Sequence, residues 1–417
     1  MTFSFNFKDR SKNYILLIAI SLLFLPFRNN ISSVVGIILF LFFFIDKEHK
    51  LSSKLKDLFT NKVAILTLSI YLIHLIGLLY TSNFKYASLD LEIKLPLFII
   101  PFVIFSEKKL TSENQNYIFK FFTLGNILAL SICFIRASYR FYVTNSPTVL
   151  FYNEFSRFMH PSYFSLYLGF NTVYLFYKIS EIDKNNANYK TNLFINISIS
   201  LFFIFGIFAL SSKAGIIISG LALIYLSIKE LFKKQVLLSL VLVSIAAIVL
   251  ILISLFKNDI VALSRFEQAK HELASGPKSA SETNGSSNSR VEIWKSGKEI
   301  LVKNLTFGVG TGDIKDELMK QYKKANFFHG VENENNCHNQ YLQFFILFGI
   351  TGGLIFIVSF LYPTIISIRN HNALYTYFIF LMVTNMLVES MLESKAGVEF
   401  YALFNAILLN YNSKKIN

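Results

Sequence analysis

Apolar runs recur along the whole chain, and most of them are separated by short polar segments. A helix needs roughly 20 apolar residues to cross the hydrocarbon layer of a bilayer, and many of these runs approach that length. In lipid, every backbone polar group must be hydrogen-bonded within the protein, which favours helices. The pattern predicts an all-α polytopic membrane protein with about twelve transmembrane helices, at residues 14–27, 31–45, 63–80, 95–105, 117–135, 161–177, 193–210, 214–228, 236–256, 341–362, 373–388 and 397–411.

Composition agrees with lipid as the main solvent of this chain. Of its 417 residues, 53% are hydrophobic and 45 are phenylalanine. The mean hydropathy is +0.48. A soluble chain could not cover so much apolar surface with polar groups. The two cysteines, Cys133 and Cys337, are too few and too far apart to suggest a disulfide framework or a metal site.

The net charge of +14 lies largely in short loops between apolar runs. If the N-terminus is cytoplasmic, the loops on that side receive most of the lysines and arginines, including Lys8, Arg10, Lys12, Lys54, Lys56, Lys229, Lys233 and Lys234. Cytoplasmic loops of membrane proteins carry such an excess of positive charge. The distribution predicts that both termini are cytoplasmic, and it explains the charge without a nucleic-acid partner.

One polar segment, residues 257–340, is far longer than the other connections. Connections of this length are usually functional or disordered. The predicted topology places the segment outside the cytoplasm. It divides the chain into N-terminal transmembrane helices at 1–256, about nine in number, an extracytoplasmic loop domain at 257–340, and about three C-terminal transmembrane helices at 341–417.

Two sequence patterns divide this long segment. Residues 274–289 are rich in Gly, Ser and Asn and predict a flexible linker. The following stretch, RVEIWKSGKEILVKN, has Val291, Trp294 and Leu301 at helical spacing. This spacing predicts a short amphipathic helix that lies along the membrane surface or packs on the spans.

A glycine run, FGVGTGD, follows this helix and contains Gly308, Gly310 and Gly312. A G-x-G-x-G run suggests a nucleotide loop only in a βαβ context with a preceding strand, and neither feature is present here. We expect a tight turn whose backbone approaches a helix end or an anionic ligand.

Two cations are candidates for phosphate binding. Arg290 opens the amphipathic helix, and a guanidinium suits bidentate contact with phosphate. Lys213 lies in ALSSKAGII, at an abrupt break between two apolar runs. Each cation is either an interfacial residue whose charge reaches into water or part of a polar cavity. Both fall on the same predicted side of the membrane as His338.

His338 and Asn339 stand at the last polar step before the apolar run 341–362. A neutral imidazole, with an ordinary pKa of about 6.5, is well suited to take a proton from a hydroxyl group near neutral pH. His338 is either such a base or a structural histidine of the interface. Asn339 beside it could orient the ring or bind a sugar hydroxyl.

A second group of polar residues lies at the outer end of another predicted span. His160 precedes Pro161 in RFMHPSYFSLY, which is also the pattern of a simple helix N-terminus. Arg157 adds a cation one turn earlier. The aromatic residues around both either stack on sugar rings or belong to the aromatic belt of the membrane interface. We include both residues among the candidate substrate-binding residues.

Acidic residues cluster around the last outer loop, at Glu389, Glu393 and Glu399. They either pair with cations such as Arg290 and hold them in place or belong to a hydrated loop. The outer loops show no spacing of carboxylates and histidines that is typical of a divalent metal site. We therefore expect a site with no metal and no cofactor.

Three segments in this order resemble the O-antigen ligase family of bacterial membrane glycosyltransferases, which includes polymerases and protein O-oligosaccharyltransferases. They are SSKAG at a span junction, SRVEIWKSGKEILVKNLTFGVGTGD in the long loop, and HNQYLQFFILFGITGGLIF at the return to the membrane. The family's loop arginine matches Arg290, and its loop histidine matches His338. Where many members have arginine after the serine at the span junction, this chain has Lys213, which lacks the bidentate fork.

The resemblance implies a large multi-span glycosyltransferase fold with one periplasmic loop domain. It implies a glycan donor on undecaprenyl pyrophosphate at the periplasmic face of the bacterial inner membrane, and an acceptor hydroxyl on a lipid A core, a protein or another glycan. On this hypothesis Arg290 and Lys213 hold the diphosphate, and His338 accepts the proton of the acceptor hydroxyl. Direct attack on the anomeric carbon would invert its configuration.

Three other functions remain open. A polymerase of the same family shares the donor and the chemistry, so the sequence barely separates it from a ligase. A transporter or flippase of lipid-linked sugars predicts charges near the bilayer midplane and internal repeats, whereas the candidate residues here gather at one face. A non-catalytic scaffold would leave the order of Arg290, the glycine run and His338 unexplained.

Overall fold

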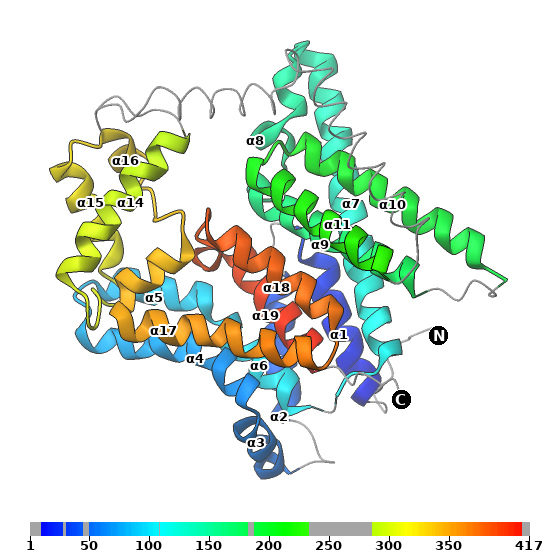
Figure 1. Ribbon diagram of the computed structural model, residues 1–417, viewed down its shortest axis with the longest axis horizontal. Coiled ribbons are helices and arrows are strands. Elements are labelled where there is room, and N and C mark those ends of the chain that lie inside the picture. The colour runs from blue at the N-terminus through cyan, green and yellow to red at the C-terminus, as the bar shows by residue number, and fades with distance from the viewer. Residues whose placement is uncertain are drawn as a thin grey trace. The chain divides into compact units, whose positions relative to one another are not determined.

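The chain folds into helices, as its apolar pattern predicts. The computed structural model describes residues 10–27, 31–44, 50–107, 109–181, 187–232 and 286–410 (Figure 1). No β-strand occurs within these ranges. The predicted run 236–256 lies outside the described residues, and every other predicted run coincides with a helix.

The chain divides into two compact units, the first formed by residues 1–22, 30–119 and 269–417 and the second by residues 23–29 and 120–268. The first unit contains most of α1 (Arg10–Phe24), the start of α7 (Ser112–Thr144), and α2 (Ile31–Phe44), α3 (Leu51–Thr60), α4 (Lys62–Ile76), η1 (Gly77–Tyr80), α5 (Phe84–Lys94), α6 (Pro96–Ser106), α14 (Ser286–Lys303), α15 (Ile314–Lys324), α16 (Phe328–Glu332), α17 (Gln340–Arg369), α18 (Ala373–Met386), η4 (Met391–Glu393) and α19 (Lys395–Leu409). The second unit contains the rest of α7, η2 (Pro147–Leu150), α8 (Tyr152–Phe155), α9 (Pro161–Ser180), α10 (Tyr189–Ala209) and α11 (Lys213–Phe232).

Several helices have the length and composition of membrane spans. Among the described residues, 4 helices are long and apolar enough to cross a membrane: Lys62–Tyr80, Ser112–Thr144, Tyr189–Ala209 and Gln340–Arg369. Shorter apolar helices occur at Ile31–Phe44, Gly215–Tyr225 and Ala373–Met386. The chain is therefore a helical membrane protein, and the full number of about twelve spans stays a prediction.

Helix α9 is buried nearly all round in the second unit and packs against α10 and α11. A Cβ added at Gly215 of α11 would lie 2.1 Å from Ser165 Oγ of α9, and one added at Gly169 of α9 would lie 2.3 Å from Ser219 Oγ of α11. Small residues let the two backbones approach this closely. Because the residue numbers rise together along both helices, α9 and α11 run parallel, and their N-terminal ends lie at the same end of the unit.

In the first unit, α17 is broken at Gly349, where φ is 63° and ψ is −163°. The break releases the carbonyl groups of Ile346 and Leu347, which accept hydrogen bonds of 2.9 Å from the backbone N–H groups of Val309 and Gly310. Non-helical backbone inside a spanning helix requires such protein partners. The glycine run predicted to form a tight turn is therefore a turn that closes against a helix.

Replacing Gly349 with alanine is expected to destabilise the protein. Alanine is strained at a φ of 63°, and its Cβ would lie 2.3 Å from the carbonyl oxygen of Thr306. Backbone strain of this kind amounts to about 1–3 kcal/mol, before the clash is counted. Thermal unfolding of the purified protein in detergent measures the loss. Gly36→Ala is the control, because no atom lies within 4 Å of its added Cβ; equal unfolding midpoints for both variants would contradict the prediction.

The described part of the long loop segment is helical. Helix α14 begins at Ser286, so residues 286–289, which the composition assigned to a flexible linker, belong to a helix. The composition did not predict a helix at these residues because Ser and Asn favour caps and turns over helix interiors. The rest of the predicted linker, 274–285, lies outside the described residues. Helix α14 packs on α17 and α15, and it contains Val291, Trp294 and Leu301, the residues that predicted it.

Candidate active site

His338 lies in the turn that leads into α17, and its backbone has a φ of 43°. Its N–H donates to Asn336 Oδ1 at 2.9 Å. On the other side of the turn, the indole Nε1 of Trp294 in α14 donates to the carbonyl of Cys337 at 3.1 Å. A histidine with positive φ is uncommon and persists where the surrounding structure fixes it, often at functional sites. Helix α14 thus helps to hold His338 in place.

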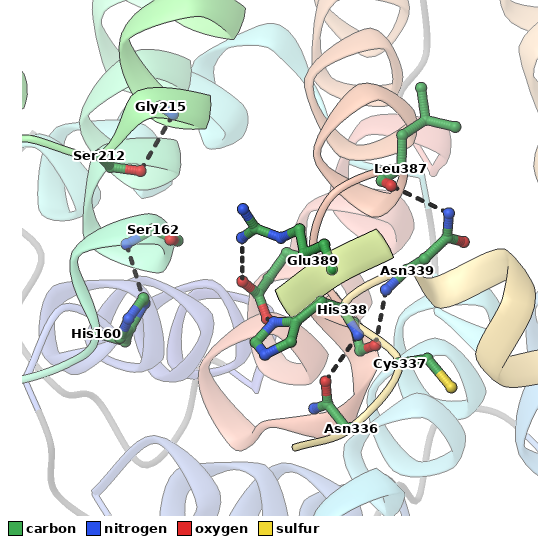
Figure 2. Close-up of polar contacts among 12 residues, drawn as sticks. His160, Ser162, Ser212, Gly215, Asn336, Cys337, His338, Asn339, Leu387 and Glu389 are labelled. Atoms are coloured by element: carbon green, nitrogen blue, oxygen red, sulfur yellow. Dashed lines mark hydrogen bonds and ion pairs between the residues drawn. The ribbon is translucent and has the colours of Figure 1, made fainter. Parts of the chain in front are cut away.

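The imidazole of His338 faces a carboxylate, as Figure 2 shows: its Nδ1 lies 3.1 Å from Oε1 of Glu389. The other oxygen of this carboxylate, Oε2, lies 3.9 Å from Nη2 of Arg290. The Glu389 side chain is 10% exposed, whereas those of His338 and Arg290 are 29% and 30% exposed. A mostly buried acid therefore pairs with two partly accessible groups, which is the pairing of acid with Arg290 that the sequence suggested.

This contact fixes which nitrogen of His338 is free for chemistry. A carboxylate can only accept hydrogen bonds, so Nδ1 of the neutral imidazole must carry the proton. The lone pair of the neutral ring then lies on Nε2. Among the hydrogen bonds of the described residues, none involves His338 Nε2. The Nε2 atom of His338 is thus available for a further hydrogen bond.

Asn339 connects the same turn to the loop that carries Glu389. Its side-chain Oδ1 accepts from the N–H of Leu342 at 2.9 Å and caps α17. Its Nδ2 donates to Leu387 O at 3.0 Å, and its backbone N–H donates to Ser390 Oγ at 3.2 Å (Figure 2). These contacts position His338 and Glu389 relative to each other. Contact between Asn339 and a substrate stays a prediction.

A buried ionic cluster also connects the start of α17 with the segment that follows α18. Lys94 of α5 is fully buried; it pairs with Asp90 one turn earlier and with Glu393 of η4, whose Oε2 lies 2.9 Å from its Nζ. Glu393 also accepts a hydrogen bond of 3.1 Å from Nε2 of Gln340, the first residue of α17. Nδ1 of His74 in α4 lies 3.1 Å from Asp90 Oδ2. The cluster therefore links α4, α5, η4 and the start of α17.

Mutual pairing keeps Lys94 and Asp90 charged. Burial by itself would lower the pKa of Lys94, but the carboxylates of Asp90 and Glu393 outweigh it and raise the pKa above its ordinary value. Burial would likewise raise the pKa of Asp90, but the Lys94 ammonium holds it below its ordinary value. Lys94 and Asp90 are thus both ionised at neutral pH, and each depends on the other.

The remaining candidates, Lys213, His160 and Arg157, lie in the second unit. His160 is the N-cap of α9, where its Nδ1 accepts from the N–H of Ser162 at 3.3 Å. It is thus a helix boundary, and its role as a ligand stays a prediction. Lys213 is the first residue of α11 and partly exposed. A cation opposes the dipole at a helix N-terminus, so helix stability does not explain Lys213.

The structure brings these three residues to one end of the second unit. Helices α9 and α11 run parallel, so His160 and Lys213 both lie at the N-terminal ends of neighbouring helices. Arg157 is exposed in the turn before His160. The six predicted site residues thus form two groups, with His338, Asn339 and Arg290 in the first unit and the other three in the second.

The sequence singled out Glu389 as an acid but did not include it among the site residues, and Lys94, Asp90 and His74 were missed. Asp90 and Lys94 are four residues apart, the spacing of a helical ion pair, and this was the available signal.

Apolar helices of spanning length, together with a histidine beside a carboxylate and a guanidinium, define a helical membrane protein with a polar cluster at the start of a spanning helix. Residues 198–357 match the family model of the O-antigen ligases. This match covers less than half of the chain and confirms its resemblance to the O-antigen ligase family. The matched range contains Lys213, Arg290 and His338, whereas Glu389 lies beyond it. No curated protein matches the chain closely enough to count as a relative.

Proposed function

We propose that this protein is a glycosyltransferase that moves a glycan from an undecaprenyl-pyrophosphate donor to an acceptor hydroxyl, in the manner of an O-antigen ligase. The observation that supports this most is the contact of His338 with Glu389, which in turn lies beside Arg290. A base and a cation side by side suit a reaction in which a hydroxyl loses a proton while a phosphate group gains charge.

In the proposed reaction, Nε2 of His338 takes the proton of the acceptor hydroxyl as its oxygen bonds to the anomeric carbon of the donor. The bond between that carbon and the pyrophosphate breaks, and the electron pair stays on the diphosphate. The attack inverts the anomeric configuration. Arg290, with Lys213 as a further proposed cation, stabilises the leaving diphosphate. Pre-placed cations of this kind would do here what a metal ion does in other transferases.

The proposed donor also explains why such groups belong at the ends of spans. Its polyprenyl tail stays in the bilayer, so its pyrophosphate reaches only residues near the membrane surface. We propose that the site faces the periplasm of the bacterial inner membrane, with both termini cytoplasmic. The proposed acceptors are a lipid A core, a protein hydroxyl or another glycan.

Purified protein in proteoliposomes tests this function when it is given undecaprenyl-pyrophosphate-linked glycan and lipid A core, with no ion gradient. A ligase transfers the glycan to the core, and the product migrates more slowly on a gel. Longer glycans that remain on the polyprenyl lipid would instead indicate a polymerase. If neither product forms with protein that is folded and correctly inserted, the proposed glycosyl transfer is wrong for these substrates.

Lys213 provides a test of the phosphate contact. Lys213→Met should lower transfer roughly 10- to 100-fold, because a hydrogen bond to a charged group contributes about 1.5–3 kcal/mol. Lys213→Arg should retain most of the activity, since it keeps the charge and adds a fork. The rate at several donor concentrations is the measurement. Lys190→Met, at the exposed start of α10, is the control, and equal rates for both methionine variants would remove Lys213 from the site.

A further inference from the structure

Helix α14 has two apolar faces, and the protein covers one of them. Ile293 and Ile300 are buried, and the backbone at Gly297 packs closely on Leu342 of α17. On another side of the helix, a stripe of residues at helical spacing remains exposed: Val291 37%, Trp294 37%, Val302 63% and, just past the helix end, Leu305 47%. Exposed apolar side chains that line up along a helix in this way mark a surface for a further partner.

The level of the membrane boundary follows from two neighbouring spans. Ser69 Oγ lies 3.2 Å from Ser359 Oγ, and a Cβ added at Gly77 would lie 2.8 Å from the Phe348 ring, so α4 with η1 runs antiparallel to α17. Residues 350–369 of α17, after its break, form about 30 Å of helix, which matches the hydrocarbon thickness. The segment 62–80 forms about 28 Å. Both segments therefore place one boundary of the hydrocarbon layer near Tyr80 and Ile350, on the side that carries His338.

The loop after α14 lies at this level. The N–H of Ile350 donates to Leu305 O at 2.8 Å, and Tyr80 Oη donates to Phe307 O at 2.8 Å. Phe307 is 66% exposed, and Leu79 of η1, which precedes Tyr80 in the chain, is 85% exposed. Exposed apolar side chains thus continue from the ends of the spans through Phe307 and Leu305 to the α14 stripe, with the exposed Thr306 and Lys303 between them.

We infer that α14 is an interfacial helix whose stripe of Val291, Trp294, Val302 and Leu305 docks on the lipid bilayer, with Phe307 inserted at its end. Figure 1 shows α14 crossing the direction of α17, as expected for a helix in the plane of the membrane. Lys295 lies beside the stripe and Lys298 lies within it, and both are exposed, so their ammonium groups can reach lipid phosphates while their stems lie along the apolar side chains. This inference does not depend on the proposed glycosyl transfer, but it would keep Arg290, which α14 carries, at the membrane surface.

Trp294 is the single tryptophan of the chain and therefore reports on this helix alone. The full protein is reconstituted in phosphatidylcholine vesicles with lipids brominated at shallow or deep acyl positions. Shallow bromines should quench the Trp294 fluorescence more than deep ones, and aqueous iodide should quench it little. Strong quenching by iodide without quenching by bromolipid would overturn the docking. Protection from both quenchers would also overturn it, because protein, such as a second copy, would then cover the stripe.

A paired variant separates docking from folding. Val302→Asp with Leu305→Asp should shift the Trp294 emission to longer wavelength and increase quenching by iodide. Lys320→Asp, an exposed position of α15 whose side chain is 78% exposed, should change neither. Equal thermal unfolding midpoints of the two variants show that both are folded. If the paired variant is folded and its fluorescence is unchanged, the stripe does not contact lipid.

Discussion

His338→Ala is expected to abolish glycan transfer, with the rate falling by about 10²–10⁴-fold, the usual contribution of a general acid–base group. The variant removes the Nε2 lone pair that Glu389 orients. It leaves intact the bond from the backbone N–H of residue 338 to Asn336 and the cap that Asn339 provides, so the turn should persist. Transfer to lipid A core by equal amounts of purified, reconstituted protein is the measurement.

A companion variant distinguishes proton transfer from orientation. Glu389→Gln keeps an oxygen that can accept from Nδ1 of His338 but removes the charge that stabilises the imidazolium and pairs with Arg290. Its rate should therefore lie between those of wild type and His338→Ala. His329→Ala is the matched control, because His329 lies in α16 of the same loop segment and contacts Asn333 instead of Glu389. Wild-type rates in His338→Ala would exclude the imidazole from the mechanism.

The helices were predictable from the sequence because a bilayer imposes one rule on every span. Each run must be apolar and must satisfy its own backbone, so position 63–80 can be assigned as a helix without knowledge of its neighbours. The break at Gly349 could not be assigned in this way. It depends on the N–H groups of Val309 and Gly310, which come from a distant loop and donate to the carbonyls that the break releases. A local apolar pattern does not record such a partner.

The site residues likewise include some that the sequence indicates and one that it could not. His338 stands next to an apolar run, where a polar residue is conspicuous, and Arg290 opens the predicted amphipathic helix, so the sequence selects both. Their common partner, Glu389, is 51 residues from His338, and the sequence could only offer it as one of several acids. The packing of α17 against α18 decides which of these acids contacts the imidazole. This packing consists of apolar contacts between spans, and such contacts have too little chemical specificity to be predicted from the sequence.

Lys94→Met is expected to destabilise the first unit more than the strain at position 349 does. It leaves the carboxylates of Asp90 and Glu393 buried without their cation, and breaking a buried pair from one side costs about 3–5 kcal/mol. Thermal unfolding in detergent should show a large fall in the midpoint. Lys85→Met is the control, because Lys85 lies exposed on the same helix α5.

The cluster also predicts how this loss is reversed. Lys94→Met combined with Asp90→Asn and Glu393→Gln removes the unpaired charges together, so it should recover most of the stability, since uncharged replacements of buried pairs are often tolerated. The new amide at position 393 could still accept from Gln340, which stands two residues after His338, so transfer should recover along with the midpoint. A single variant as stable as Lys85→Met would show that Lys94 is not paired as the structure has it. Recovery of stability without transfer would instead show that the charge of Glu393 itself positions the start of α17, and with it the base.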